Sequence, residues 1–211
     1  IGMVHQHFML VPSLTVLENI ILGREHTHLG MTNYIKAERE VKEIAQKYSL
    51  DVKLSAKVYE LSVGEMQRVE ILKSIYRGAK LLILDEPTAV LIPQETQQLF
   101  EILRTLTSQG CSVVFISHKL KEVLEISNRI TVMRGGVVTG RVITKETDET
   151  ELATLMVGRK VVFRVKKDKA NPGEVLVEVK NVDAQNDRGL PALKNLNFSI
   201  RRGEILGVAG V

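Results

Sequence analysis

The sequence predicts an α/β fold in which a parallel core sheet carries an inserted helical subdomain. Residues 81–84 are four consecutive apolar residues, which is typical of a strand buried on both faces of a covered parallel sheet. After Pro87 the helical and strand patterns alternate, as they do in a doubly wound domain. Between a first strand at 1–6 and the strand at 81–84 the patterns are almost only helical. We therefore expect a helical subdomain inserted between two strands of the core.

The helices of this insertion are indicated by caps and by apolar spacing. The segment 15–18, Thr-Val-Leu-Glu, is a capping-box pattern, which predicts a helix that begins there and ends at Gly23. A polar loop is expected at 24–33. Apolar residues at helical spacing predict a second helix from about 33 to 50 and a third from about 64 to 77.

Turn residues bracket the elements that follow residue 90. Pro93 at a first helical position and Gly110 just past a last one predict a helix between them. The glycine pair at 135 and 136 predicts a hairpin. The other expected elements are a strand at 111–117, a helix at 120–127, hairpin strands at 129–133 and 137–142, and a helix from 147 to about 158.

The chain is expected to contain one domain and the beginning of another. Residues 165–173, which are rich in lysine and include Pro172 and Gly173, form the best linker candidate between 1–164 and 174–211. An alternating strand is expected at 175–179, and two further strands between 192 and 211. Because the chain opens inside a strand pattern without methionine, we expect a fragment of a longer protein.

Composition narrows the function classes. The chain has 211 residues, of which 44% are hydrophobic and only 4% aromatic, and its net charge of +4 is spread along the sequence. A nucleic-acid binder would more often show a basic stripe with aromatic residues, so nucleic acid is not expected as a partner. The single cysteine, Cys111, excludes an internal disulfide and is expected to be a buried structural thiol. No apolar run approaches the ~18 residues of a membrane span.

Two carboxylates stand where the strand at 81–84 must end. Asp85 and Glu86 precede Pro87, which cannot continue a ladder of hydrogen bonds. In open α/β sheets ligands bind beyond the carboxyl ends of the strands. One carboxylate can hold Mg²⁺ on a nucleotide while its neighbour orients or deprotonates an attacking water. A solvated acidic turn with no chemical role is the alternative interpretation.

Three further stretches change that balance: 61–68 (Leu-Ser-Val-Gly-Glu-Met-Gln-Arg), 116–118 (Ile-Ser-His) and 4–8 (Val-His-Gln-His-Phe). In their order and separation, together with the Asp85-Glu86 strand, they resemble the Q-loop, LSGGQ signature, Walker B strand and switch histidine of the ATP-binding cassette of ABC transporters. The resemblance implies a P-loop NTPase-like ABC cassette over about 1–160. It is incomplete at the N-terminus, because no G-x-x-x-x-G-K-[ST] motif is present.

The resemblance assigns expected roles to residues near the strand ends. Asp85 would bind Mg²⁺ directly or through water, and Glu86 would be the general base or the water-positioning group. His118 would hydrogen-bond the γ-phosphate of ATP. Gln6 would contact Mg²⁺ or the attacking water, and its loop would transmit the nucleotide state to a partner. ATP and Mg²⁺ are the ligands that this set implies.

Ser62, Val63, Gly64 and Glu65 are expected at a helix start, where backbone N–H groups favour anions. By resemblance this signature would touch ATP held by an opposite cassette, although a capped helix start would explain it equally well by itself. Val63 replaces the usual glycine and Glu65 the usual glutamine, which implies two unequal composite sites.

The second part, 174–211, resembles the first strands of another cassette, with Gly210 as the first glycine of its Walker A loop. A tandem arrangement resembles the ATPase subunit of bacterial importers for simple sugars and nucleosides. It would lie at the cytoplasmic face of the plasma membrane, contact separate permease subunits through the Gln6 loop and the helical subdomain, and serve an extracytoplasmic solute-binding protein indirectly.

Three alternatives remain open at this point. The chain could belong to a soluble ABC-type ATPase that acts on ribosomes or DNA, or to a non-catalytic interaction module with a cassette-like surface. A metal site at the paired histidines His5 and His7, or His26 and His28, is less favoured because no Cys, Asp or Glu obviously completes either pair.

Overall fold

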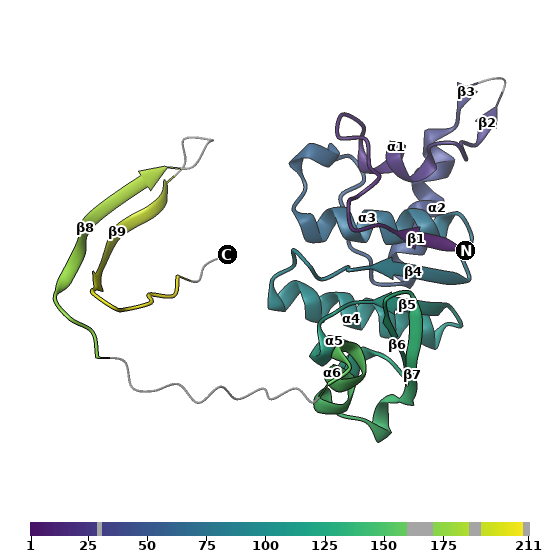
Figure 1. Ribbon diagram of the computed structural model, residues 1–211. Helices are drawn as coiled ribbons and strands as arrows, with labels where there is room; N and C mark the ends of the chain where they lie inside the picture. Colours follow the sequence, from purple (N-terminus) through teal and green to yellow (C-terminus); the bar gives the residue numbers. More distant parts are fainter. Residues whose placement is uncertain (29–30, 160–170, 186–190, 209–211) are drawn as a thin grey trace. The chain divides into compact units, whose positions relative to one another are not determined.

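A computed structural model describes residues 1–28, 31–159, 171–185 and 191–208 (Figure 1). The chain divides into two compact units, Ile1–Val161 and Val162–Val211, and each is considered by itself. Most of the expected linker at 165–173 lies outside the described residues. The domain boundaries at 164 and 174 therefore stay predictions.

The core of the first unit is a parallel sheet with the strand order β1-β4-β5. β1 is Gly2–Val4, β4 is Leu81–Asp85 and β5 is Ser112–Ile116. The helices α1 (Val16–Ile21), α2 (Tyr34–Lys47) and α3 (Val63–Tyr76), with a short 3₁₀ turn at Val58–Glu60, all fall between β1 and β4 in the chain. The expected helical insertion is thus confirmed, and Figure 1 shows these helices on the β1 side of the sheet.

The burial of β4 differs from the expectation. Leu82 and Leu84 are fully buried against α3 and α4, but Leu81 and Ile83 on the opposite face are only half-buried. Val114, which pairs with Ile83, is 45% exposed. The prediction of a strand buried on both faces is wrong for the described residues, because the packed apolar side chains of the helices lie on the Leu82 face.

The loop expected at 24–33 contains a small hairpin, which no alternation of apolar and polar residues in the sequence predicted. β2 (Thr27–His28) pairs antiparallel with β3 (Met31–Thr32), and residues 29–30 between them are not described. A contact distant in sequence holds this segment, since the His26 ring lies 2.7 Å from a carboxylate oxygen of Glu40 on α2. Pairing of a polar segment through tertiary contacts is outside what periodicity can predict.

The elements after β4 follow the expected order. They are α4 (Pro93–Ser108), α5 (Leu120–Ile126), β6 (Arg129–Arg134), β7 (Val137–Ile143), a 3₁₀ turn (Thr144–Glu146) and α6 (Glu149–Val157). Gly135 and Gly136 both have positive φ, 57° and 80°, as the two-residue turn of a hairpin requires. α5, α6 and β6 share a second apolar cluster around Val123, Val132 and Leu152.

The main core joins the sheet to the helical insertion and to α4. Its fully buried residues include Ile20 of α1, Leu72 of α3 and Leu103 of α4. The rings of Phe100 and Phe115 meet edge to face at 5.9 Å, which is a favoured aromatic geometry. Cys111 is buried as expected, and this burial raises the pKa of its thiol. A raised pKa fits a structural role rather than a reactive one.

The second unit shows one antiparallel hairpin, β8 (Val175–Gln185) paired with β9 (Pro191–Arg201). The strand expected at 175–179 is therefore present and longer. Of the two strands expected between 192 and 211 only β9 forms, because 204–208 has no neighbouring strand to pair with among the described residues. Gly210 lies outside the described residues. Across the described ranges, helices of the length and apolar character needed to span a membrane are absent.

Candidate functional site

The parallel sheet brings three of the expected site segments to one edge. Val4 is paired with Leu84, and Asp85 with Ile116. Gln6, Glu86 and His118 each follow one of these paired positions by one or two residues. Since parallel strands end at the same edge of a sheet, residues from three distant parts of the chain lie at the carboxyl edge, where open α/β sheets bind ligands.

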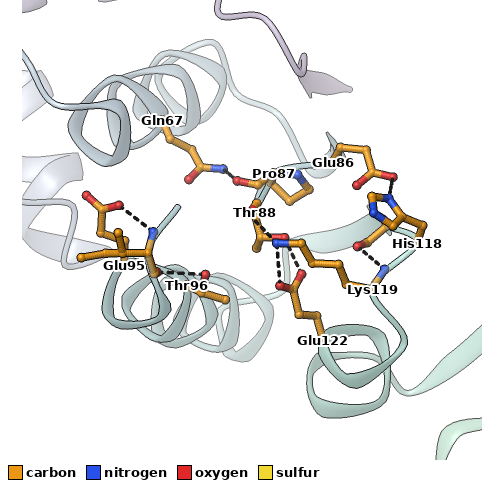
Figure 2. A network of polar contacts seen from close by, with 11 residues as sticks. Gln67, Glu86, Pro87, Thr88, Glu95, Thr96, His118, Lys119 and Glu122 are labelled. Atoms are coloured by element: carbon orange, nitrogen blue, oxygen red, sulfur yellow. Dashed lines mark hydrogen bonds and ion pairs between the residues drawn. The ribbon is translucent and has the colours of Figure 1, made fainter. Parts of the chain in front are cut away.

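Glu86 and His118 are in direct contact at this edge (Figure 2). The His118 Nδ1 lies 2.8 Å from Glu86 Oε1, so that the ring donates its Nδ1 proton to the ionised carboxylate. This assignment leaves the other ring nitrogen, Nε2, for a ligand. The His118 side chain is 70% exposed and that of Glu86 only 21%. Within the described residues the second carboxylate oxygen, Oε2, is buried and has no hydrogen-bond partner. A buried acceptor of this kind calls for a ligand or water.

Glu86 also has a strained backbone. Its φ of +47° lies in the left-handed region, which costs a residue other than glycine about 1–3 kcal/mol. Its N–H donates to the Ile116 carbonyl at 2.9 Å, and its carbonyl accepts from the Ala89 N–H at 3.2 Å. Such strain persists only where the surroundings fix the chain, and it is found most often at functional sites.

Side chains from two helices hold the segment directly after Glu86. The Gln67 amide on α3 donates to the Pro87 carbonyl at 2.8 Å, and the Lys119 ammonium donates to the Thr88 carbonyl at 2.7 Å. Glu122 accepts from the Thr88 hydroxyl and forms an ion pair with Lys119 at 3.2 Å. Figure 2 shows Gln67 on one side of the segment and the Lys119–Glu122 pair on the other.

Sequence reasoning missed Gln67, Thr88, Lys119 and Glu122. One signal was available: Gln67 occupies a buried position of α3, three residues after buried Gly64 and four before buried Ile71. A polar residue on the core face of a helix is unusual and is normally hydrogen-bonded. Its partner at Pro87, however, could not be inferred from spacing.

The signature residues lie at the start of α3, as expected, and cap it. The Ser62 N–H donates to Glu65 Oε2 at 2.7 Å, and the Glu65 N–H donates to Ser62 Oγ at 3.3 Å. This is a complete capping box, and the hydrogen bond from the Ser62 backbone holds the pKa of Glu65 below its ordinary value. An ionised carboxylate therefore lies at the start of α3.

The two residues between them are placed by packing. Val63 is the first residue of the helix and is half-buried. Gly64 is buried, and a Cβ there would lie 2.6 Å from Glu95 Oε1 of α4. A side chain at position 64 would therefore require the end of the Glu95 side chain to shift. The same Glu95 accepts the Ile92 N–H at the start of α4, at 3.2 Å.

Gln6 lies in an exposed bend, and the chain after it is fixed by the helical insertion. The fully buried Asn19 accepts the Val11 N–H at 2.7 Å and donates to the Val11 carbonyl at 3.1 Å. The Lys73 ammonium on α3 donates to the Met9 carbonyl at 2.9 Å. The Gln6 loop is thus held to α1 and α3, whereas the Gln6 side chain itself faces solvent.

The paired histidines do not form a metal centre in the part of the chain that the structure describes. His5 and His7 are exposed, and His26 is paired with Glu40. Within those ranges, no group of at least three His, Cys, Asp or Glu side chains is arranged to hold a metal ion.

Comparison with known proteins shows similarity to ABC transporter proteins. Residues 1–89 match the sequence profile of the ABC transporter family. The whole chain aligns at 45% identity with 44% of a glucose import ATP-binding protein of Haloferax volcanii. It also aligns at 46% identity with 42% of a nucleoside import ATP-binding protein of Lactococcus lactis subsp. cremoris and with 41% of a guanosine import ATP-binding protein of Bacillus subtilis. The chain therefore spans less than half the length of these curated relatives.

Solved structures with the same fold are ABC transporter components. A dimeric bacterial ABC transporter cassette superposes with a TM-score of 0.56 at 23% identity, over 68% of this chain and 62% of that one. An ABC transporter in an inward-facing conformation superposes with a TM-score of 0.64 at 19% identity, over 95% of this chain and 72% of that one. The expected P-loop ABC cassette fold is confirmed, and residues 1–89 of this chain match the sequence profile of the ABC transporter family.

Proposed function

We propose that the complete protein is the ATP-binding and ATP-hydrolysing subunit of an importer, which energises uptake of a simple sugar or nucleoside through separate membrane subunits. The observation that carries the proposal is the Glu86–His118 pair at the carboxyl edge of the sheet. Glu86 is strained, its Oε2 is buried without a partner among the described residues, and it ends the strand that carries Asp85. Relatives over the full length of the chain are sugar and nucleoside import ATP-binding proteins.

The residues at this edge fit a Mg²⁺–nucleotide complex. Mg²⁺ prefers hard oxygen ligands and is bound in proteins through one or two carboxylates together with substrate phosphates. Asp85 and the amide oxygen of Gln6 would hold it, and the bound ion would neutralise charge on the phosphates. Among the described residues Glu86 Oε2 has no partner, and this free acceptor supports a ligand at the edge.

The chain's own residues then divide the work of hydrolysis. Glu86 orients a water through Oε2 and accepts its proton. His118 would act as the imidazolium, which donates from both ring nitrogens: Nδ1 holds the Glu86 carboxylate and Nε2 donates to the γ-phosphate, so that loss of the phosphate changes the contacts of the ring. Because both side chains follow adjacent parallel strands, their separation is fixed by the sheet.

The signature at Ser62–Glu65 would serve a second, weaker site. Its capping box uses the Ser62 N–H and the Glu65 N–H, and the ionised Glu65 would repel a phosphate. The competent site would combine Asp85 and Glu86 with the signature of a second cassette. That cassette would begin at 174 in the same polypeptide, with Gly210 opening its Walker A loop.

The proposed partners follow from the same arrangement. The Gln6 loop is tied to α1 and α3 by Asn19 and Lys73, so a permease subunit contacting this loop and the helical insertion would sense the state of the sheet edge. A solute-binding protein would be linked indirectly, and the protein would work at the cytoplasmic face of the plasma membrane. An ATPase acting on ribosomes or DNA is not favoured, because the relatives named above are import proteins.

The test is Glu86→Gln in the full-length protein assembled with its membrane subunits. Loss of the general base should lower ATP turnover ~10²–10⁴-fold and leave ATP binding unchanged. Glu101→Gln, at an exposed position of α4, is the matched control and should keep wild-type turnover. A Glu86→Gln protein with full ATPase activity would overturn the proposed function.

A further inference from the structure

Two consecutive carbonyls after Glu86 are bound by side-chain donors from opposite sides. Gln67 donates to the Pro87 carbonyl and Lys119 to the Thr88 carbonyl, at 2.8 and 2.7 Å. Gln67 comes from the helical insertion, whereas Lys119 directly follows His118 and directly precedes α5. We call these two donors the clamp. It connects both parts of the first unit to the segment that carries Glu86 (Figure 2).

The clamp is buried on the Gln67 side and partly exposed on the Lys119 side. Gln67 is 2% exposed, and Thr88 is fully buried. The Lys119 ammonium is fixed by Glu122, which also accepts the Thr88 hydroxyl proton. A buried amide on the core face of α3 is unfavourable unless it is hydrogen-bonded. An apolar side chain could fill the same space. The amide at this position therefore indicates that its hydrogen bond is needed to fix the backbone geometry.

The backbone geometry that needs to be fixed is the conformation of Glu86. A residue other than glycine at a φ of +47° relaxes unless its neighbours prevent it. The peptide planes after Pro87 and Thr88 contain the carbonyls that the clamp binds, and their orientation limits how far the chain at Glu86 can relax. Rotation of either plane would move the Glu86 carboxylate away from His118 and from the position of an attacking water.

We infer that Gln67 and Lys119 are positioning residues for hydrolysis, which act through Glu86 by holding the Pro87 and Thr88 carbonyls. The inference rests on the proposed function. It assigns Gln67, two residues beyond the signature, to the geometry of this chain's own hydrolytic edge. A misplacement of about 1 Å at a reacting group can lower a rate ~10²-fold, which sets the expected scale.

The first test is Gln67→Met in the full-length protein with its membrane subunits. Methionine keeps the length of the side chain and removes the donor. The expected result is a kcat lower by ~10- to 100-fold with the KM for ATP within about twofold, because misplacement affects the transition state and not nucleotide binding. Gln97→Met, at an exposed position of α4, is the matched control and should leave both constants unchanged.

Lys119→Met tests the other side of the clamp. Because the Lys119 side chain is 37% exposed, this variant is expected to fold even if the buried Gln67 variant folds poorly. It should show the same fall in kcat. In a Glu86→Gln background, either clamp variant should lower the single-turnover rate no further, because the residue it positions is gone. A purely structural role predicts instead a lower unfolding midpoint with normal kcat in the folded protein.

Hydrogen exchange of the peptide spanning 86–91 gives a readout independent of turnover, and it should be faster in Gln67→Met than in Gln97→Met. Unchanged exchange, wild-type kcat in both clamp variants, or losses that remain additive with Glu86→Gln would each overturn the inference. A wild-type protein that hydrolyses no ATP, or one whose Glu86→Gln variant is fully active, would instead overturn the proposed function.

Discussion

The carboxyl edge of the sheet and the start of α3 are both assigned to ATP by resemblance, but they differ in how their polar groups are satisfied. At the sheet edge, Glu86 has a φ of +47° and a buried oxygen without a partner among the described residues. At the start of α3, Ser62 has an ordinary extended conformation with a φ of −69°, and it exchanges hydrogen bonds reciprocally with Glu65.

This difference separates a stability feature from a functional one. The capping box lowers the free energy of the folded state by itself, and no ligand is needed to explain it. The Glu86 geometry raises the free energy of the folded state. It is maintained by hydrogen bonds from Gln67 and Lys119 to the two following carbonyls and by the bond from the Glu86 N–H to the Ile116 carbonyl. Strain that is held in place in this way points to chemistry. Substitutions at the sheet edge should therefore lower ATP turnover and leave stability nearly unchanged, whereas those at the start of α3 should lower stability and leave turnover nearly unchanged.

The largest effect is expected at the sheet edge. His118→Ala removes the partner of Glu86 Oε1 and the proposed γ-phosphate contact, so ATP turnover should fall ~10²–10⁴-fold. The free energy of unfolding should change by less than about 0.5 kcal/mol, because the side chain is largely exposed. Steady-state ATPase assays and urea unfolding of the same preparation measure both. Loss of stability with normal turnover would remove the distinction between the two regions.

A smaller effect of the opposite kind is expected at the start of α3. Ser62→Ala deletes the hydroxyl that accepts the Glu65 N–H and should lower the free energy of unfolding by about 1 kcal/mol. Turnover at the Glu86 site should stay close to wild type. Ser108→Ala, at an exposed position near the end of α4, is the control for loss of a hydroxyl. If Ser62→Ala reduced turnover as strongly as His118→Ala, the signature of this chain would be essential to hydrolysis.

The smallest effect concerns pH. The Ser62 N–H lowers the pKa of Glu65 below 4.5, so the folded state binds this proton more weakly than the unfolded state does. The resulting stabilisation is fully present above pH 4.5 and is lost as the pH falls through the lowered pKa. Urea unfolding at neutral and acid pH should show that the free energy of unfolding falls less on acidification for Glu65→Gln than for wild type. Equal losses would mean that this carboxylate does not stabilise the helix start.

Local signals in the sequence predicted most elements correctly. The capping boxes at 15–18 and 62–65, Pro93 at the start of α4 and the glycine pair at 135–136 each specify a backbone conformation through neighbours at most a few residues away. The resemblance also assigned Glu86 and His118 to positions near strand ends. Their direct contact at 2.8 Å depends on the parallel register of β4 and β5.

The errors share one cause. Half-burial of Ile83, the hairpin at β2 and β3 and the missing strand at 204–208 all depend on what packs or pairs beside a segment. Periodicity describes the segment alone and does not specify its neighbours. Gln67 is the clearest case: its residue type and helical position were visible, but its bond to Pro87 joins positions twenty residues apart.

The sequence by itself therefore determined the α/β order of elements, the helix boundaries and the identity of the residues at the strand ends, because these depend on local conformational preferences and on motif spacing. Only the tertiary structure decided which of these residues meet. Packing of α3 and α5 against the segment after β4 fixes the strained Glu86 and leaves one of its oxygens for a ligand. Long-range contacts of this kind maintain a conformation that the local preferences of the chain disfavour.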